Sequence, residues 1–504
     1  MWLSAVAAAL ILIAGAGLWR LTQGPIDLDL LTPYLQEALN RSAGGLQITV
    51  SGVRLGINRD TSQLDMWIAG LRITQPDGEP LAAFSSISAD FSLRSLLRGR
   101  MEPTRLIVER PLLRVIRDKA GAIQIRFSDP ENEASSIGPE IFEQLAGPPN
   151  PEAFFGLMRR AVVRNATLIF DDRQTGRRWR ANRIDAAVER DSQGLTGDLS
   201  LALPIAAREP ELHASYRYLA SEHALDITLE VGALELAALA SLAPELAPLA
   251  LANFPVTGTL ATRLRLPELT SEGLRLDAYF GKGSIKSGLL PEGYLALQEG
   301  TLRAVYAPET GEIRLVKLDL DLGGGSALSA KGTIAGVTPA MIAGGALPSS
   351  IPGKLDLMLA DVPVQKFESL WPPSLSHGGR RWVLENVHEG VLDEASVKLD
   401  LDVDAVKRSA EVVSAHGTMR YHDATVNYFR GLTPARRVSG TATLQDKRLV
   451  FTPSSGTVRS LQLTGGSLEI TDLGAPVEWL TVDLGLIGPL QDVLETIDAK
   501  PLRY

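Results

Sequence analysis

The chain has 504 residues, of which 45% are hydrophobic, and its formal net charge is −9. A surface that binds nucleic acid needs an excess of Lys and Arg, so this charge argues against DNA or RNA as a partner. Cysteine is absent, which excludes disulfides, thiolate metal sites and cysteine nucleophiles. The 46 glycines and 30 prolines are typical of a protein with many strands and turns.

The first predicted element is an apolar helix between Trp2 and Trp19. This run contains no charged residue, and as a helix it spans about 27 Å, enough to cross the hydrocarbon core of a bilayer. Its terminal indole rings favour the membrane interface. We expect a retained transmembrane anchor; a signal peptide cleaved near Ala14-Gly15-Ala16 and a buried helix are the alternatives. No Lys or Arg precedes the run, so the flanking charges give no orientation.

Behind the anchor, most predicted elements are strands. Thr32 is typical of a helix N-cap and Pro33 of a first-turn proline, so a helix is expected over Tyr34–Asn40. Strands are predicted at Leu46–Ile57, Leu64–Thr74, Ile87–Leu93, Arg105–Arg117, Ala122–Phe127, Val162–Phe170 and Ile184–Arg190. Two short helices are expected in Leu234–Leu251, which contains two prolines. Strand blocks at 254–362 and 391–487 flank a helical insert, and a last helix is expected at Pro489–Ile497.

Four segments alternate between apolar and polar residues. Successive side chains of a strand point to opposite faces, so each segment has one apolar and one polar face. The apolar residues are Leu225, Ile227, Leu229 and Val231; Val316, Leu318, Leu320 and Leu322; Val397, Leu399, Leu401 and Val403; and Leu480, Val482 and Leu484. They are the candidate lining of a lipid groove, although the dry core of a closed sandwich explains the same alternation.

The pattern predicts a mainly β fold: a long, twisted and curled antiparallel sheet, groove-like and repetitive, with short helical inserts and one N-terminal transmembrane helix. The predicted divisions are residues 1–20 (anchor), 21–135 (first β module), 136–253 (helix-containing linker and second β module), 254–362 (third β module), 363–390 (helical insert) and 391–504 (C-terminal β module). A chain of this length has room for several such modules.

No motif in the sequence predicts catalysis. Nucleophile-elbow, phosphate-loop and zinc-protease motifs are absent, and Gly281-Lys282-Gly283 lacks the helix that holds a phosphate. Asp171 and Asp172 are adjacent at a strand end, so they point to opposite faces and cannot act on one bond. We interpret them as part of a solvated turn. We therefore expect no enzyme activity, no cofactor and no metal site.

Two clusters of arginine stand near strand ends. They are Arg94, Arg98, Arg100 and Arg105, and Arg173, Arg177, Arg178, Arg180 and Arg183 around Trp179. Basic side chains near a membrane attract anionic headgroups, at roughly 1 kcal/mol for each residue. Charged strand edges and tips also prevent aggregation between sheets. The second interpretation is the simpler one.

The helical insert is the most distinctive segment. Its marked residues are Trp371 and Pro372, then Arg380, Trp382 and Asn386 on a predicted helix, and Gly390 before the next strand. This pattern resembles the YhdP branch of the AsmA-like proteins, and we interpret these residues as structural. Similar to further blocks of that family are Tyr428-Phe429-Arg430-Gly431-Leu432, Gly440-Thr441-Ala442 and Gly488-Pro489-Leu490.

The resemblance implies a bacterial envelope protein with one span in the inner membrane and its body in the periplasm. Its sheet is expected to pass phospholipid between the inner and outer membranes along an apolar groove, with outer-membrane or periplasmic proteins as further partners. The family has no assigned catalytic residues. Its members continue for more strands, so this chain is expected to be shortened or a fragment. A scaffold or assembly factor for outer-membrane biogenesis, without transport, is the alternative.

Overall fold

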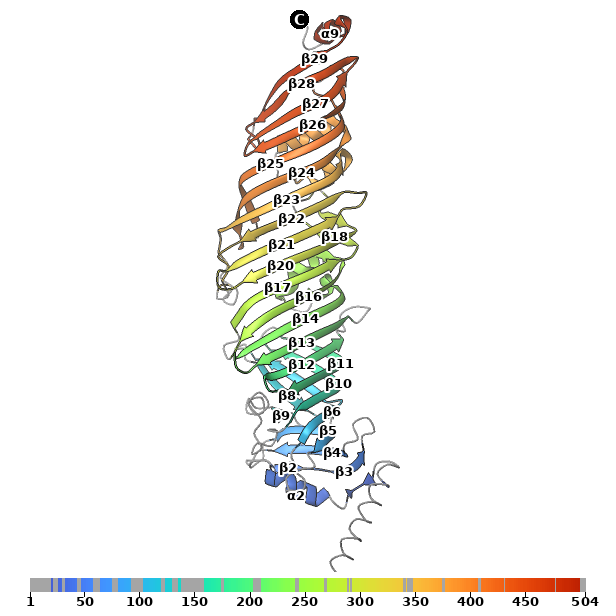
Figure 1. The fold of residues 1–504 in the computed structure, drawn as a ribbon, viewed down its shortest axis with the longest axis vertical. Coiled ribbons are helices and arrows are strands. Elements are labelled where there is room, and N and C mark those ends of the chain that lie inside the picture. Colours follow the sequence, from blue (N-terminus) through green and yellow to red (C-terminus); the bar gives the residue numbers. More distant parts are fainter. Residues whose placement is uncertain are drawn as a thin grey trace, which may run out of the picture. The chain divides into compact units, whose positions relative to one another are not determined.

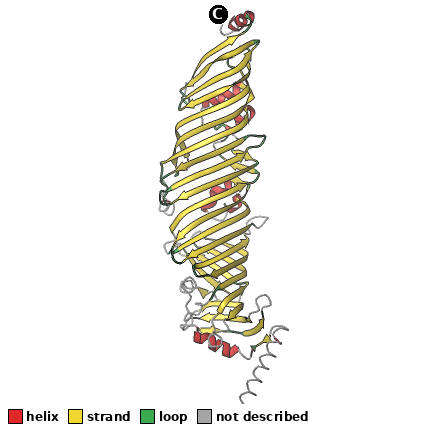
Figure 2. Ribbon diagram, in the orientation of Figure 1, coloured by secondary structure: helices red, strands yellow, loops and turns green. Residues whose placement is uncertain are grey.

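The computed structural model confirms the mainly β prediction, with an antiparallel sheet of many strands and few short helices (Figure 1, Figure 2). The structure describes residues 20, 26–29, 32–42, 47–57, 64–74, 80–91, 103–118, 123–128, 135–136, 158–173, 176–202, 210–240, 244–266, 270–287, 290, 292–338, 341, 348–373, 377–406, 409–429, 431–475 and 477–498. The chain forms two compact units. Unit 1 is Met1–Val231 with Arg263–Thr270, and unit 2 is Gly232–Thr262 with Ser271–Tyr504.

Unit 1 begins with a helix packed on short strands. These elements are β1 (Ile26–Asp27), α2 (Thr32–Ser42), β2 (Gln47–Thr49), β3 (Gly52–Ile57), β4 (Leu64–Thr74) and β5 (Pro80–Phe91). The helix begins at Thr32, as its sequence predicts. Leu39 is 3% exposed and joins Ile48 and Ile68 in a small core. The amide of Asn40 reinforces this packing, because its Oδ1 accepts the N–H of Ile48 at 2.5 Å.

The rest of unit 1 mixes parallel and antiparallel pairing. Its strands are β6 (Pro103–Glu109), β7 (Leu112–Arg117), β8 (Ile123–Ser128), β9 (Ser135–Ser136), β10 (Arg160–Asp172), β11 (Arg177–Arg190), β12 (Gly194–Ala202), β13 (Glu211–Leu219) and β14 (Ala224–Glu235) up to Val231. Strand β10 runs parallel to β6 and β7, and β10 to β14 pair antiparallel in chain order. Ala166, Ala181 and Ile184 form the core of this region.

Unit 2 is dominated by an antiparallel ladder in chain order. Its strands are β15 (Ala252–Asn253), β16 (Pro255–Arg265), β17 (Thr270–Phe280), β18 (Gly283–Lys286), β19 (Tyr294–Leu297), β20 (Glu299–Ala307), β21 (Glu312–Asp321), β22 (Ala327–Ile334), β23 (Ile351–Pro363), β24 (Val387–Asp404), β25 (Ser409–Val426), β26 (Ala435–Gln445), β27 (Arg448–Val458), β28 (Leu461–Thr471) and β29 (Trp479–Ile487). Strand β17 pairs with β20, and each strand from β20 to β29 pairs with the next. Strands β15, β18 and β19 form a separate small sheet.

Short helices interrupt unit 2 where the sequence predicts them. They are α5 (Leu236–Leu239), η2 (Pro244–Leu251), η3 (Val364–Lys366), α7 (Phe367–Leu370), α8 (His377–Asn386) and α9 (Leu490–Asp498). Pro248 lies inside η2, which is a 3-10 helix. Lys366 anchors the insert to the β21–β22 turn, because its Nζ donates to Ser326 Oγ at 3.0 Å.

Two predicted strands are each split in the structure. Leu46–Ile57 contains both β2 and β3, and Arg105–Arg117 contains both β6 and β7. The second break falls at Arg110, which has a φ of 51°, followed by Pro111. Proline has no N–H for a ladder, and a positive φ interrupts the extended backbone. The apolar–polar alternation of the sequence therefore continues through Arg110 and Pro111, although the backbone ends one strand and begins another there.

The predicted N-terminal anchor lies outside the described residues, apart from Arg20. Arg94, Arg98 and Arg100 lie outside them as well. Among the residues that the structure does describe, no helix is both long and apolar enough to cross a membrane.

Glycines stand opposite aromatic residues at three places in the ladders. The pairs are Gly197 with Tyr216, Gly300 with Phe280, and Gly440 with Tyr421. A methyl group on any of these glycines would fall within contact distance of the opposite ring, and in each case it would also meet backbone of a neighbouring strand. Glycine in a strand interior commonly marks such a close approach. Each aromatic ring therefore lies over the glycine position, where a larger residue would displace it.

Candidate functional site

The pairing register of unit 2 aligns apolar residues into rows that cross the ladder. One row reads Leu302, Leu318, Ala330, Leu357, Val397, Gly417, Leu444, Leu449, Ile470 and Leu480 from β20 to β29. The next row reads Gly300, Leu320, Leu328, Leu359, Ala395, Met419, Ala442, Phe451, Leu468 and Val482. Residues opposite each other in register share one face of a sheet. Unit 2 therefore has one continuous apolar face, which we call the apolar face.

Three of the four predicted groups meet on this face. The structure brings together Leu318 and Leu320 on β21; Val397, Leu399, Leu401 and Val403 on β24; and Leu480, Val482 and Leu484 on β29. The sequence pattern does not predict most of the other residues in these rows, which lie on the strands between the predicted groups. Glycine and alanine, such as Gly332 and Ala330, interrupt the apolar alternation on those strands and weaken its signal.

Val316 does not share the face of Leu318, which the alternation in the sequence predicts for it. The register of β21 shifts between Leu315 and Leu318 on its β22 side, so Val316 belongs to a β-bulge. A bulge adds one residue to a strand and reverses the alternation beyond it. Leu315 consequently joins the apolar face, opposite Ala304 and Gly332, and Val316 is 40% exposed. Leu322 lies just beyond β21 and packs beside Leu320.

The opposite face of unit 2 carries polar and charged residues paired across strands. Arg303 Nε lies 2.5 Å from Asp277 Oδ1, and Lys331 Nζ lies 3.8 Å from Asp356 Oδ2. The neighbouring Lys317 ammonium and Ser329 hydroxyl lower the pKa of Asp319. Exposed pairs of this kind add at most about 1 kcal/mol each. Their main effect is to keep this face hydrated, so the sheet is amphipathic.

The chain itself covers part of the apolar face. Phe254, Phe280, Leu297 and Leu320 form a buried cluster, and residues of α5 and the small sheet, among them Leu236 and Ile285, pack against it. Leu297 is 1% exposed and Leu320 is 4% exposed. The rings of Phe254 and Phe280 are 5.0 Å apart between centroids. At β17 to β22 the face is therefore a dry core.

The same face is open at β29. Leu480 is 42% exposed and Val482 is 48% exposed, whereas Val397, Leu399, Leu401 and Val403 on β24 are half-buried. Leu480, Val482 and Val397 belong to the two rows, and Leu399, Leu401 and Val403 alternate with polar residues on the same side of β24 as Val397. Their exposure is therefore not a result of pointing to the polar side. Between β23 and β29 the chain leaves apolar surface that another apolar group can contact.

Unit 1 has an apolar face of its own on β13 and β14. The fourth predicted group, Leu225, Ile227, Leu229 and Val231, stands opposite Tyr218, Tyr216, Ala214 and Leu212 in register. Burial raises the pKa of Tyr216, and the nearby Asp198 carboxylate raises it further. All four predicted residues are half-buried. The structure therefore places this group on one face as predicted.

Tyr421 is a polar residue on the apolar face of unit 2. It stands opposite Leu392 and Gly440, and its ring meets that of Phe451 edge-on, with centroids 6.2 Å apart. Burial raises the pKa of its phenol to about 12. The neutral phenol is therefore the form that this apolar surface accommodates.

The predicted structural residues of the insert hold its helices together. Arg380 on α8 donates from Nε to Trp371 O at 2.9 Å and from Nη2 to Glu368 O at 3.0 Å. Asn386 Nδ2 donates to Trp382 O at 2.9 Å. Pro372 follows α7, and Gly390 has a φ of 112°. Both tryptophans are half-buried rather than fully buried, so their packing energy is smaller than that of a core residue.

The interpretation of Asp171 and Asp172 as a solvated turn is wrong for Asp172. The two carboxylates do point to opposite faces, but Asp172 is 5% exposed. Arg117 holds it with two hydrogen bonds, from Nε to Oδ1 at 2.9 Å and from Nη2 to Oδ2 at 2.5 Å. A bidentate arginine compensates for the desolvation that burial of a carboxylate costs. The turn prediction missed this because Arg117 is 55 residues away in sequence.

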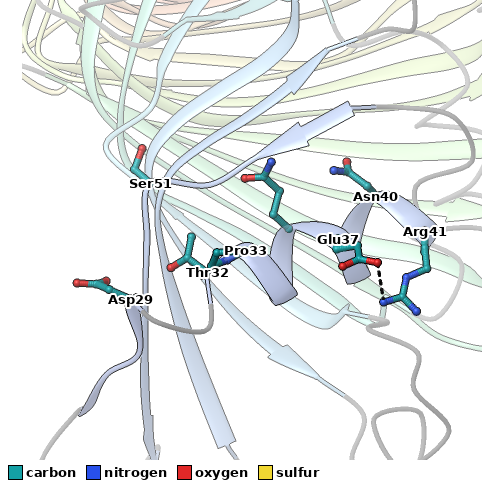
Figure 3. A pocket seen from close by; sticks show the side chains of 8 residues that line it. Asp29, Thr32, Pro33, Glu37, Asn40, Arg41 and Ser51 are labelled. Carbon is teal, nitrogen blue, oxygen red and sulfur yellow. Dashed lines mark ion pairs between the residues drawn. The ribbon is translucent and has the colours of Figure 1, made fainter.

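An open hollow of 620 Å³ lies beside the first turn of α2 (Figure 3). It is lined by Asp29, Thr32, Pro33, Gln36, Glu37, Asn40, Arg41 and Ser51. Glu37 and Arg41 form an exposed ion pair at 3.5 Å, and Gln36 accepts the Val50 N–H at 3.4 Å. These groups bind the helix to itself and to its strands. They do not converge on a common point.

Comparison with protein-family models, with curated proteins and with solved structures gives no match for this chain. The resemblance to the AsmA-like proteins therefore stays a prediction, as does the division into six segments. Among the described residues, no cluster of His, Asp or Glu has the arrangement of a metal site.

Proposed function

We propose that the apolar face of unit 2 binds the acyl chains of phospholipid in a protein that carries lipid between the inner and outer membranes. The observation that carries the proposal is the pair of in-register apolar rows from β20 to β29. Beyond β22 the side chains of these rows are half-buried or exposed, apart from the buried Ala395 and Ala442. Leaving apolar side chains in water is unfavourable by about 25 cal/mol per Å². An acyl chain lying on the face removes this cost.

The chemistry of the two faces supports a lipid rather than a protein ligand. The apolar rows contain no charged side chain. They therefore have no charged group that could recognise the sequence of a peptide or a polar headgroup. An acyl chain gains about 0.8 kcal/mol for each buried CH₂ and needs no hydrogen bond. The headgroup can remain in water, because an acyl chain lying on the face does not require the headgroup to be buried with it.

The cellular setting of the proposal comes from the sequence. The apolar run at residues 2–19 and the Trp-Pro and Arg-x-Trp pattern of the insert resemble inner-membrane proteins of the YhdP branch, with a periplasmic body. The groove-like curl of the sheet and the single membrane span belong to this proposal. So do phospholipid and the inner membrane as partners, with outer-membrane or periplasmic proteins beyond them.

Site-specific photo-crosslinking tests the proposal. We expect a photoreactive residue at Leu399 or Leu401 to capture phospholipid in cells, because both side chains lie on the apolar face, on the same side of β24 as Val397. Lys398 and Asp400 are the matched controls, since they alternate with these residues on the polar face. Leu320 is an internal control, because the small sheet covers it. Equal lipid capture on both faces of β24, or capture on neither, would contradict the proposal.

One stretch of unit 2 favours the alternative function, a scaffold or assembly factor that does not transport lipid. Where Phe254 and Leu297 cover the face, unit 2 has the closed core of an ordinary structural domain. If this cover extended over β24 in the cell, the Leu399 and Leu401 probes would capture protein segments instead of lipid. The crosslinking experiment therefore separates the two functions.

A further inference from the structure

We propose that the hydroxyl of Tyr421 donates a hydrogen bond to the ester group of a bound phospholipid, so that the apolar face selects ester-linked over ether-linked lipid. This inference rests on the proposed function, because it names the lipid group that one residue of that face recognises. The β25 residues opposite the apolar-face residues of β24 are Ala410, Val412, Ala415, Gly417 and Met419. Tyr421 follows Met419 by two residues on the same side of the strand. It is the only one of these six residues with a polar side chain.

The hydroxyl of Tyr421 differs from that of Tyr306, a second tyrosine on the apolar face. Tyr306 lies on β20 two residues beyond Ala304, and its hydroxyl donates to Val337 O at 2.9 Å. The Tyr421 hydroxyl has no acceptor among the residues that the structure describes. A tyrosine hydroxyl in an apolar setting usually has a partner. A ligand lying on the face would supply the acceptor that the chain does not.

Neighbouring residues fix the position of the Tyr421 ring. The ring of Phe451 meets it edge-on, with centroids 6.2 Å apart. Its hydroxyl lies over Gly440, where an added methyl group would come within 3.0 Å of the hydroxyl oxygen. The glycine leaves the room that the phenol occupies. A donor held in place before binding loses little conformational entropy when a ligand engages it.

The phenol of Tyr421 carries its proton at neutral pH and is within reach of a ligand. Burial raises its pKa to about 12, so the neutral donor is the form present. The residue is half-buried, and its oxygen is not one of the fully buried polar atoms that lack a partner in the described part of the chain. The oxygen of Tyr421 can therefore meet an acceptor on the open side of the face.

An ester suits this donor better than the other polar groups of a phospholipid. Its carbonyl oxygen is an uncharged acceptor and is bonded directly to the acyl chain. A phosphate is charged and costs far more to remove from water than a neutral group that gains a hydrogen bond. An acyl chain on the apolar face therefore brings a carbonyl to the phenol while the headgroup stays in water. An ether-linked lipid has similar chains without the carbonyl.

Lipid binding by the purified full chain tests the inference with two phosphatidylcholines of the same chain length, one ester-linked and one ether-linked. Each displaces a fluorescent phospholipid from the protein. We expect the wild type to bind the ester lipid about fivefold more tightly, which is the effect of one hydrogen bond between neutral groups. Tyr421→Phe keeps the ring and should bind both lipids with the affinity of the wild type for the ether lipid.

Tyr306→Phe is the matched control, because it removes a hydroxyl of the same face that Val337 O already accepts from. It should keep the preference of about fivefold. Equal affinity of the wild type for the two lipids, or the same preference in Tyr421→Phe, would overturn the inference and leave the acyl-chain proposal standing. Binding of neither lipid by the wild type would overturn both.

Thermal unfolding at neutral pH without lipid gives a second readout. Tyr421→Phe should unfold at the temperature of the wild type or above it, because its hydroxyl has no acceptor to lose. Tyr306→Phe should unfold at a lower temperature, because it removes the hydrogen bond to Val337 O. An equal fall in both variants would mean that the Tyr421 hydroxyl is already bonded within the chain, which contradicts the inference.

Discussion

Leu320 and Val482 occupy the same register row of unit 2, yet their surroundings are opposite. Leu320 on β21 is 4% exposed beneath the small sheet. Val482 on β29 is 48% exposed. Both lie on strands with the same apolar–polar alternation. The difference shows that alternation determines which side of the sheet a residue faces, whereas distant segments determine whether that side is covered. The covered core and the exposed apolar surface therefore belong to different stretches of one face.

The largest expected effect is at the covered end. Leu320→Ala should lower the free energy of unfolding by about 3 kcal/mol, because it leaves a cavity in a closed core. Val482→Ala should lower it by less than about 1 kcal/mol, because the side chain is already half in water. Urea unfolding followed by tryptophan fluorescence measures both. Equal losses at the two positions would mean that β29 is covered as fully as β21.

The insert should have an intermediate effect. Trp382 is half-buried, so Trp382→Ala is expected to cost about 2 kcal/mol rather than the 3–5 kcal/mol of a fully buried tryptophan. Arg381→Ala is the control on the same helix, since Arg381 is exposed and should change stability by no more than about 0.5 kcal/mol. Chemical unfolding gives both values. A normal stability with loss of lipid delivery would instead make the insert part of the functional surface.

The pH dependence of stability should show how deeply Tyr421 is buried on β25, which lies between β21 and β29. Its pKa is raised to about 12 in the folded protein, against about 10 in an unfolded chain. Between these values the unfolded state loses the proton while the folded state keeps it, so stability falls as the pH rises. We expect a loss of roughly 1 kcal/mol by pH 11. Tyr421→Phe should lack this part of the decline in urea unfolding at pH 9 and pH 11, and identical declines would place the phenol in water.

The smallest effect is expected on the polar face. Lys331→Gln removes an exposed ion pair with Asp356 in which the charged atoms are 3.8 Å apart. Pairs of this kind contribute between zero and about 1 kcal/mol, so unfolding should shift by no more than about 0.5 kcal/mol. Repeating the measurement in 1 M salt should abolish even this difference. A loss comparable to that of Leu320→Ala would show that the polar face is buried against another element.

Much of the fold could be predicted because its strands carry a local signal. The alternation at Val397 to Val403 placed those residues on the correct face, and Thr32 marked the start of α2. The bulge at Val316 could not be predicted, because an extra residue leaves the composition of a strand unchanged. The cover over Leu320 comes from Phe254 and Leu297, which are distant in sequence. The parallel pairing of β7 with β10 also could not be predicted, because no local pattern encodes that partner.

The glycine–aromatic pairs limit how this sequence can diverge. Gly440 and Tyr421 meet across β25 and β26, and a side chain on Gly440 would collide with the tyrosine hydroxyl and with the backbone of β27. A substitution at the glycine becomes tolerable only after its partner shrinks and the adjacent strand shifts. The two members of each pair should therefore be inherited together. Related chains are expected to retain these pairs long after their surface residues have been replaced.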